Sequence, residues 1–408
     1  MLNSMCERAK AASLVLGSTD TETRNGALAA MADALTACAD EIIAANEKDI
    51  LRARENGMSD AMLDRLTLTK ERIQAISSGV KKVIALPDPL AGSEKHIRPN
   101  GLEITKKRVP FGVIAIIYEA RPNVTADAAA LCVKSGNAVI LRGGKEAIDS
   151  NLAIAGVLSR ALCSLGMPEG CVAVVPDTSR ETASKLMRMK GQVDLLIPRG
   201  GKSLIRSVVE NATVPVIETG AGNCHVYFDE SCDEKIALDV IDNAKRQRPS
   251  VCNAAESLLV HESVAKKLLP MVKSRLDNVE IRGCEKTLGI IDALPATDED
   301  YFTEYNDYIL AVKVVSDVYE AVKHINIHGT GHSEAIITQN PENAEYFCNN
   351  IDAAAVYVNA STRFTDGEEF GFGAEIGIST QKMHARGPMG LPEMTTYKYV
   401  IRGEGQIR

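Results

Sequence analysis

The sequence predicts an α/β protein with two α/β domains built on parallel-type sheets. Short apolar runs rich in β-branched residues, such as GVIAIIY (112–118) and ESLLVHE (256–262), alternate with longer helical patterns. Near-continuous apolar strands separated by helices are typical of parallel sheets covered on both faces. The chain has 408 residues, 45% of them hydrophobic, which is enough for two or three domains that each bury a core.

The first 95 residues read as helices. Residues 18–49 begin at a Ser-Thr-Asp cluster that can cap a helix, and their apolar residues recur at the spacing of one helical face. Two further helices are expected over 59–66 and 69–86. The segment PDPLAG (87–92) then ends the helical region because proline and glycine interrupt helices.

Two series of strands follow. The first is expected at 112–118, 138–142, 172–176, 193–198 and 214–218, and the second at 225–230, 256–262, 308–315, 333–338 and 354–360. Helical stretches lie between the strands, including 126–134, 150–165 and 181–189. Each series is long enough to form the sheet of one α/β domain.

Two segments stand outside this alternation. Residues 97–110 contain an Asn100-Gly101 pair between β-prone runs, which indicates a hairpin. The C-terminal segment 391–408 is strand-like but too polar for a core. We expect these two segments to form a small oligomerisation flap. The first domain is then 1–96 and 111–220, and the second is 221–390.

Composition excludes several classes of function. The chain carries 46 basic and 54 acidic residues, a net charge of −8, which argues against nucleic-acid and anionic-membrane partners. No apolar run is long enough to span a bilayer, and the N-terminus does not resemble a signal peptide. The ten cysteines show no CxxC spacing, so we expect core thiols in a reducing cytoplasm, without disulfides or a metal site.

One tetrapeptide occurs twice at equivalent places. Arg-Gly-Gly-Lys follows a predicted strand and precedes a helix at 142–145 and again at 199–202. Backbone N–H groups at such a helix start, with basic side chains beside them, favour phosphate. The pattern is neither a Walker loop nor the G-x-G-x-x-G fingerprint, and a glycine pair can also be a plain turn.

Cys252 differs from the other cysteines. It follows Lys245, Arg246 and Arg248, and Pro249-Ser250 end the preceding helix. A thiol beyond a cationic helix end is favoured as a thiolate, which is a strong nucleophile. A structural role for this cysteine stays open on chemistry alone.

Three histidines, His324, His328 and His332, are spaced four residues apart. Gly329 and Gly331 argue against one continuous helix across the three histidines, because glycine disfavours helix. No acidic partner completes a zinc set, so no metal is expected.

The chain resembles the aldehyde dehydrogenase superfamily, and within it the gamma-glutamyl phosphate reductase family. The resemblance rests on VPFGVIAIIYEARPN (109–123), GNAVILRGGKEA (136–147), VIETGAGNCHVYFDE (216–230) and RPSVCNAAESLLV (248–260). The stretches 315–336 and 359–391 resemble the signature and the C-terminal block of the narrower family. It covers about residues 5 to 405 and implies an aldehyde dehydrogenase-like fold.

The resemblance implies where a dinucleotide binds. Arg142 lies where many relatives have a lysine that contacts the adenosine ribose, and with Lys145 nearby it would suit a 2′-phosphate, hence NADPH. Gly200 and Gly201 fall at the turn beneath the cofactor pyrophosphate. Glu304 matches a glutamate that holds the nicotinamide ribose. The first domain is then the NADPH-binding domain and the second is catalytic.

The resemblance also implies the catalytic residues. Cys252 falls at the nucleophile. Asn123 falls near the asparagine of the oxyanion hole, although an alignment without a gap puts Arg121 there. Glu218 occupies the place of the base that activates water in aldehyde-oxidising relatives.

The substrate of this family, L-glutamyl 5-phosphate, carries a phosphate and a carboxylate and demands cations near the thiol. Arg246, Arg248 and Arg363 are candidates, with Arg386 a further one, and the resemblance adds His332.

The expected reaction is NADPH-dependent reduction of L-glutamyl 5-phosphate to glutamate 5-semialdehyde and phosphate through a cysteine thioester, the second step of proline biosynthesis from glutamate. A hydrolytic NAD(P)-dependent aldehyde dehydrogenase is the main alternative. A cysteine hydrolase with His225 or His332 as base, and a catalytically silent oligomer, rank below it. Expected partners are the small-molecule substrate, further copies of the chain and a complex with glutamate 5-kinase.

Overall fold

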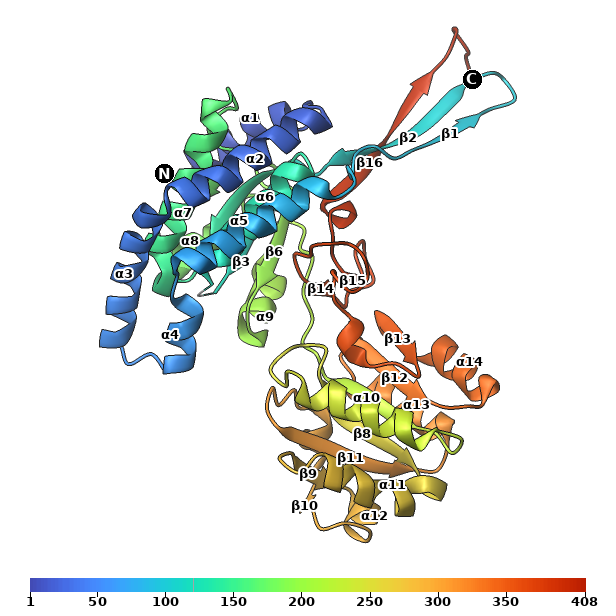
Figure 1. Ribbon diagram of the computed structural model, residues 1–408. Helices are drawn as coiled ribbons and strands as arrows, with labels where there is room; N and C mark the ends of the chain where they lie inside the picture. The colour runs from blue at the N-terminus through green and yellow to red at the C-terminus, as the bar shows by residue number, and fades with distance from the viewer. Residues whose placement is uncertain (120) are drawn as a thin grey trace. The chain divides into compact units, whose positions relative to one another are not determined.

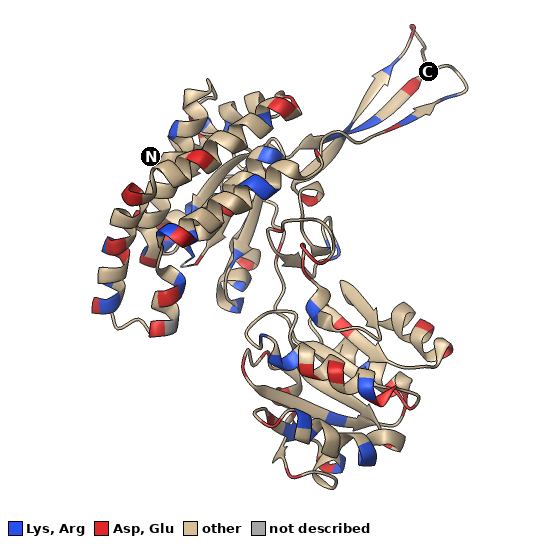
Figure 2. Cartoon of the chain, viewed as in Figure 1, with Lys and Arg blue, Asp and Glu red and all other residues tan. Residues whose placement is uncertain are grey.

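The computed structural model describes residues 1–119 and 121–408, which divide into two compact units (Figure 1). Unit 1 contains residues 1–218, 372–377 and 389–408, and unit 2 contains residues 219–371 and 378–388. Each unit has its own parallel sheet with helices, which confirms the predicted α/β class. Acidic and basic residues are mixed along the helices of both units (Figure 2). None of the helices in the described ranges is long and apolar enough to cross a membrane.

The N-terminal helical region contains one more break than the sequence predicts. The stretch predicted as one helix over 18–49 is two helices, α2 (Thr21–Ala37) and α3 (Ala39–Glu55), separated at Cys38. Asp20 caps α2 by accepting from the N–H of Thr23, as the Ser-Thr-Asp cluster suggested. Apolar spacing continues across Cys38, so periodicity could not reveal the break.

The remaining helices of unit 1 flank the sheet or the N-terminal helices. They are α1 (Leu2–Leu16), α4 (Asp60–Leu66), α5 (Lys70–Ala85), α6 (Pro122–Lys134), α7 (Ile148–Ser164), α8 (Arg180–Met187) and α9 (Lys202–Asn211), with a 3₁₀ turn, η1 (Lys145–Ala147), before α7.

The main sheet of unit 1 has four parallel strands in the order β5-β4-β3-β6. The strands are β3 (Val113–Tyr118), β4 (Ala138–Arg142), β5 (Val172–Val174) and β6 (Leu195–Arg199). Every residue of β3 is buried, as a central parallel strand requires. The predicted strand at 214–218 is wrong: Val216 forms only an isolated bridge to Leu196. Pro215 has no N–H to donate, which shortens this pairing.

Unit 2 is built on seven parallel strands in the order β10-β9-β11-β8-β7-β12-β13. They are β7 (Cys224–Phe228), β8 (Ala255–His261), β9 (Glu280–Gly283), β10 (Leu294–Pro295), β11 (Ile309–Val315), β12 (Ser333–Ile337) and β13 (Ala355–Val358). The helices are α10 (Glu234–Arg246), α11 (Glu262–Arg275), α12 (Glu285–Leu288), α13 (Val318–His328) and α14 (Pro341–Asn350). The sequence did not predict β9 and β10, two short strands without an apolar run, of which β10 forms the edge of the sheet.

A separate three-stranded antiparallel sheet joins β1 (Ser93–Ile97), β2 (Glu103–Pro110) and β16 (Thr395–Arg402). Gly101 has a φ of +84° in the β1–β2 turn, a backbone conformation that favours glycine. Figure 1 shows the sheet as a narrow ribbon, and Gln406 near the C-terminus donates to the carbonyl of Asn100 in that turn. A two-stranded pair, β14 (Ile378–Ser379) and β15 (Gly387–Pro388), lies in unit 2.

Candidate active site

Cys252 lies, partly buried, in the turn between α10 and β8 of unit 2. The N–H of Ala254 donates to the carbonyl of Val251 at 3.0 Å and closes this turn. Gly222 packs directly against it: a Cβ on Gly222 would stand 1.5 Å from the carbonyl oxygen of Cys252. Only glycine allows the two backbones to approach this closely. The predicted nucleophile is therefore held between its own turn and the 219–223 segment.

Glu304 is brought to the same place. Its Oε1 accepts from the N–H of Gly222 at 2.8 Å. The loop that carries Glu304 is also held by Glu256, because the N–H of Asn306 donates to Oε1 of Glu256 at 3.1 Å. The sequence therefore selected two residues, Cys252 and Glu304, whose segments meet at Gly222.

A buried ion pair supports that anchor. Lys245 and Glu256 are both fully buried and lie 2.6 Å apart, Nζ to Oε2. Burial raises the pKa of Glu256 to about 7 and lowers the pKa of Lys245, although each stabilises the charge of the other. Breaking such a pair leaves an uncompensated buried charge, which is strongly destabilising. The pair thus helps to hold the loop that carries Glu304, through the hydrogen bond from Asn306 to Glu256.

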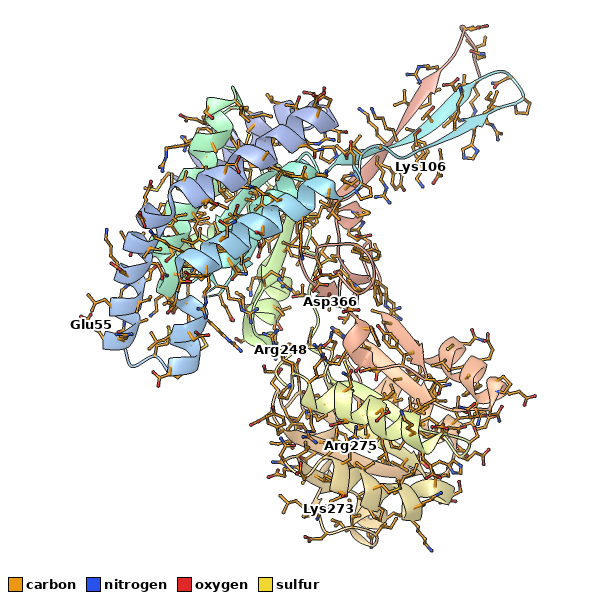
Figure 3. All side chains as sticks on the ribbon, in the orientation of Figure 1. Glu55, Lys106, Arg248, Lys273, Arg275 and Asp366 are labelled. Atoms are coloured by element: carbon orange, nitrogen blue, oxygen red, sulfur yellow. The ribbon has the colours of Figure 1, made fainter. Side chains whose placement is uncertain are left out.

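Arg363 lies beside the residue that follows Cys252. Its Nη1 donates to Oδ1 of Asn253 and its Nε to Oε1 of Gln247 at 3.0 Å. Burial lowers the pKa of Arg363, and the neighbouring Arg248 lowers it further while Cys252 opposes the shift. Arg248 itself is exposed (Figure 3). Two of the predicted arginines therefore gather around the Cys252 turn.

Arg246 and His332 are placed differently. Arg246 donates to the carbonyl of Arg275 at 2.6 Å and pairs with Asp242 and Asp277, so it is held against the end of α11. His332 is fully buried, with Nδ1 2.8 Å from Oγ of Ser333. Burial lowers the pKa of His332 to about 4, so the ring is neutral at neutral pH.

Two of the three spaced histidines, His324 and His328, lie in the last turns of α13, and His332 lies beyond its end. Helix α13 stops at His328 and its C-cap is Gly329, as the glycines indicated. The rings of His324 and His328 stack with centroids 4.0 Å apart, and burial lowers the pKa of His324. Within the described ranges, no group of three or more His, Cys, Asp or Glu is arranged to hold a metal. All ten cysteines lie in those ranges, and none is disulfide-bonded.

The first RGGK loop follows β4 in unit 1. Gly143 is buried in a cradle that a side chain would fill, since a Cβ there would stand 2.2 Å from Nδ2 of Asn151. Arg142 points Nη2 at the carbonyls of Thr178 and Ser179, and its Nε is buried without a hydrogen-bond partner in the described structure. Lys145 is exposed at the start of η1.

The second RGGK loop follows β6 and leads directly into α9. The N–H of Gly201 donates to Oε1 of Glu119 at 3.1 Å, and a Cβ on Gly200 would stand 2.6 Å from Cδ of the same glutamate. A carboxylate therefore already lies at this helix N-terminus, where anions are favoured. A cofactor phosphate at this amide would have to displace Glu119.

The last two predicted residues belong to unit 1. Asn123 is exposed at the start of α6 and donates Nδ2 to Asp127 at 3.1 Å. Arg121 is the N-cap of the same helix. Glu218 is partly buried at the end of unit 1, directly before the 219–223 segment.

These residues fit a dinucleotide in unit 1. The buried, unpartnered Nε of Arg142 offers a donor to an anionic group, and the exposed Lys145 adds charge three residues later. The strand-end position of both loops is where ligands bind open parallel sheets. The fit is clearer at the first loop than at the second, where Glu119 takes the amide.

The fold and the cysteine turn define a class of protein. Residues 1–288 and 299–400 match the model of the aldehyde dehydrogenase family, so the chain belongs to that family of NAD(P)-dependent oxidoreductases. Gamma-glutamyl phosphate reductases from Caldanaerobacter subterraneus subsp. tengcongensis and Clostridium perfringens are each 58% identical over 98% of this chain and 98% of their own. Within the superfamily, the chain belongs to the gamma-glutamyl phosphate reductases.

Solved structures agree with this assignment. The gamma-glutamyl phosphate reductase of Thermotoga maritima is 50% identical, with a TM-score of 0.99 over 100% of this chain and 99% of its own. The corresponding protein of Saccharomyces cerevisiae is 30% identical, with a TM-score of 0.54 over 99% of this chain and 98% of its own. The predicted aldehyde dehydrogenase-like fold is confirmed.

Sequence reasoning missed Glu119 and the Lys245–Glu256 pair as partners of the predicted residues. Glu119 directly follows β3, and β3 pairs with β6, whose end carries the second RGGK loop. Because carboxyl ends of neighbouring parallel strands meet at one edge, strand order would have pointed to Glu119. Nothing in the sequence predicts the ion pair, since Lys245 is one of several basic residues at the end of a predicted helix.

Proposed function

We propose that this chain reduces L-glutamyl 5-phosphate to L-glutamate 5-semialdehyde and phosphate, with NADPH as the reductant and a thioester on Cys252. The proposal rests mainly on the Cys252 turn, which has Gly222 against its backbone and Arg363 beside it. The names of relatives that are 58% identical over nearly the whole chain support the substrate.

The chain's own residues divide the reaction as follows. The Cys252 thiolate attacks the acyl carbon and the phosphate leaves, which forms the thioester. The backbone N–H of Cys252 and the side chain of Asn123 stabilise the oxyanion that develops. A bound NADPH supplies the hydride that reduces the thioester. Cys252 then leaves as the thiolate and the aldehyde is released.

The cationic neighbours select the substrate. Arg248 and Arg363 hold its phosphate and carboxylate, because a guanidinium binds both groups in bidentate fashion. We assign no direct contact to Arg246 or His332, since Arg246 is engaged by two aspartates and His332 is fully buried. Glu218 need not activate water, because phosphate is displaced by the thiolate and no water is consumed.

The cofactor and partners follow the same logic. Arg142 and Lys145 would hold the 2′-phosphate, Gly200 and Gly201 would lie under the pyrophosphate once Glu119 is displaced, and Glu304 would hold the nicotinamide ribose. The exposed three-stranded sheet joins copies of the chain into a homo-oligomer. A complex with glutamate 5-kinase would protect the labile acyl phosphate, and the ten unbridged cysteines suit the reducing cytoplasm.

The reverse reaction tests the proposal. Glutamate 5-semialdehyde should drive NADP reduction only when phosphate is present, and Cys252→Ser should lower kcat by about 10³-fold or more with the fold unchanged by circular dichroism. NADP reduction without phosphate would indicate a hydrolytic aldehyde dehydrogenase instead. Thiol-dependent activity without any nicotinamide would indicate a cysteine hydrolase, and an unreactive Cys252 would indicate a silent oligomer.

A further inference from the structure

Unit 2 contains a cavity that the proposed reaction does not use. It has a volume of about 220 Å³ and lies between the end of α13, the 329–331 loop and the segment after β14. This is smaller than the roughly 300–1,000 Å³ of pockets for drug-sized ligands, so it suits a small metabolite. Its polar lining includes Glu334, Asp352, Thr330, Lys382 and Arg386.

Glu334 is a buried carboxyl in the cavity lining with one oxygen that lacks a partner in the described part of the chain. The side chain is 1% exposed, and its Oε2 accepts from both the N–H and Nδ1 of His225, at 2.7 and 3.0 Å. Its Oε1 has no hydrogen-bond partner within the described part of the chain. A Cβ on Gly329, which lines the cavity, would stand 2.9 Å from this oxygen. An unpaired acceptor therefore faces the cavity, and leaving it unsatisfied is costly.

Two basic side chains, Lys382 and Arg386, also line the cavity. Arg386 donates Nη2 to Asp352 at 2.7 Å, and Lys382 pairs with the other oxygen of Asp352 at 2.6 Å. A guanidinium has five N–H donors, more than one carboxylate can use. Two cations and two carboxylates make the lining neutral overall, and of these four groups only Glu334 is buried.

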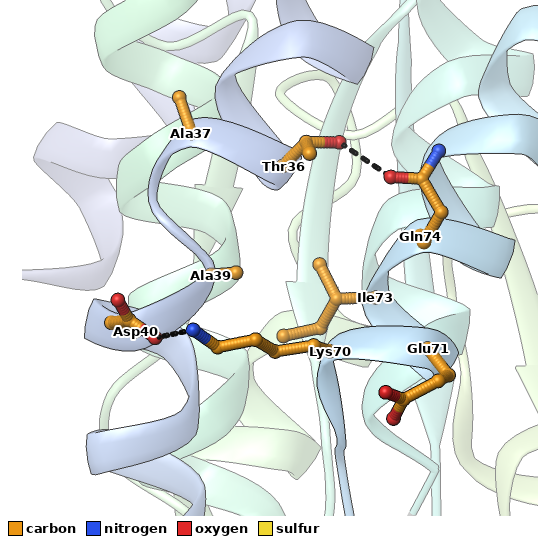
Figure 4. Close-up of a pocket in the computed structure, with 8 residues that line it drawn as sticks. All are labelled: Thr36, Ala37, Ala39, Asp40, Lys70, Glu71, Ile73 and Gln74. Carbon is orange, nitrogen blue, oxygen red and sulfur yellow. Dashed lines mark hydrogen bonds and ion pairs between the residues drawn. The ribbon is translucent and has the colours of Figure 1, made fainter.

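A second pocket, in unit 1, differs because its charged side chains are exposed to solvent. The pocket between α2, α3 and α5 is lined by Thr36, Asp40, Lys70 and Gln74 among others (Figure 4). Asp40 and Lys70 pair with each other at 2.8 Å, and their side chains are 84% and 67% exposed. Water satisfies groups of that exposure. Glu334 has no such access to solvent.

We propose that this cavity binds a free α-amino acid, with the ligand's ammonium on Oε1 of Glu334 and its carboxylate on Arg386 and Lys382. A zwitterion matches the arrangement because it carries the two opposite charges close together and no net charge. Neither half alone does: an anion would meet the Glu334 carboxylate, and a simple amine would leave the cations unused. A buried carboxylate gains most from a charged donor.

The three matched probes are L-alanine, propionate and ethylamine, because the last two each lack one of the charged groups of alanine. Isothermal titration of the full-length protein should show L-alanine binding at least about tenfold more tightly than either half. Arg386→Gln and Glu334→Gln should each weaken alanine binding about tenfold. Arg275→Gln is the control, because Arg275 pairs with Asp239 and Asp242 outside the cavity.

Several results would overturn the proposal. Equal affinity for alanine and for either half would show that the site does not require a zwitterion. An absence of heat with alanine would show that the protein does not bind this amino acid. If Arg363→Gln abolished binding while Arg386→Gln behaved like the control, alanine would be binding at the Cys252 turn instead. Because Arg386 is partly exposed, its variant keeps the test decisive even if Glu334→Gln fails to fold.

Discussion

The two RGGK loops have the same four residues and different surroundings. At the first, 142–145, Gly143 is enclosed by Tyr118 and Asn151, and a 3₁₀ turn precedes the helix. At the second, 199–202, the chain enters α9 directly, and the equivalent glycine, Gly200, lies against the exposed side chain of Glu119.

The difference lies in what each loop offers an anion. The first loop has an arginine nitrogen without a hydrogen-bond partner in the described structure, whereas the amide of the second already binds the carboxylate of Glu119. Identical sequence therefore gives different chemistry, because the neighbouring strand supplies the partner. The first loop is the stronger candidate for the cofactor's 2′-phosphate.

Matched alanine substitutions should give the largest difference between the loops. Gly143→Ala places a Cβ 2.2 Å from Asn151 and 3.2 Å from Tyr118, so it should lower the free energy of unfolding by about 2–3 kcal/mol. Gly200→Ala, the equivalent change, places a Cβ 2.6 Å from Cδ of Glu119, whose exposed side chain can shift, and should cost less than about 1 kcal/mol. Urea denaturation of both variants measures this, and equal losses would contradict the comparison.

Asp127, which lies near Arg199 of the second loop, should make the free energy of unfolding depend on pH. Burial raises its pKa from 3.8 to about 6, against the opposing effects of Asn123 and Arg199. The folded state then binds the proton more tightly than the unfolded chain, so this contribution to stability is lost as pH rises from about 4 to 6.

Asp127→Asn should therefore stabilise the protein by about 2 kcal/mol at pH 8, since one pKa unit corresponds to about 1.4 kcal/mol, and by much less at pH 4. Urea unfolding at both pH values checks this expectation. A gain of the same size at both would show that the carboxyl is not the cause.

Replacing the arginine of each loop should affect the preference for NADPH over NADH at the first loop only. Arg142→Leu should raise the KM for NADPH about tenfold and leave the KM for NADH unchanged, since only NADPH carries the 2′-phosphate. Arg199→Leu, the equivalent change at the second loop, should not alter the ratio of the two KM values. If Arg199→Leu changed that ratio and Arg142→Leu did not, the second loop and not the first would bind the 2′-phosphate.

Glu119 should give the smallest effect. Glu119→Gln keeps an acceptor for Gly201 but removes the negative charge at the start of α9, which should cost about 0.5 kcal/mol at low salt. The loss should disappear in about 1 M salt, where surface charges are screened. Glu146→Gln beside the first loop is the comparison, and a loss that persists in high salt would rule out a charge effect.

Much of the fold was predictable because it is local. Alternating apolar strands and helices identified both sheets, and the Asn100-Gly101 turn identified the hairpin. The break at Cys38 and the failed strand at 214–218 were not predictable from periodicity. Both depend on how neighbouring segments pack rather than on the residues within the segment.

The candidate site divides in the same way. Cys252 stood out in the sequence because a cationic, helix-ending segment precedes it, and Glu304 entered through the family resemblance. Arg246 has an equally suggestive position in the sequence, but the structure engages it with Asp242 and Asp277. Proximity along the chain cannot tell which side of a helix end an arginine takes.

The sequence by itself determined the alternation of strands and helices, the two glycine loops and the cysteine that differs from the other nine. Only the tertiary structure decided the partners: Glu119 meets Gly201 across 82 residues, and Asn253 meets Arg363 across 110. It also decided that Glu334 pairs with His225 across 109 residues and keeps one oxygen unpaired. Local patterns follow from backbone preference and apolar periodicity, whereas such contacts arise only when the strand order of the sheet brings distant segments together.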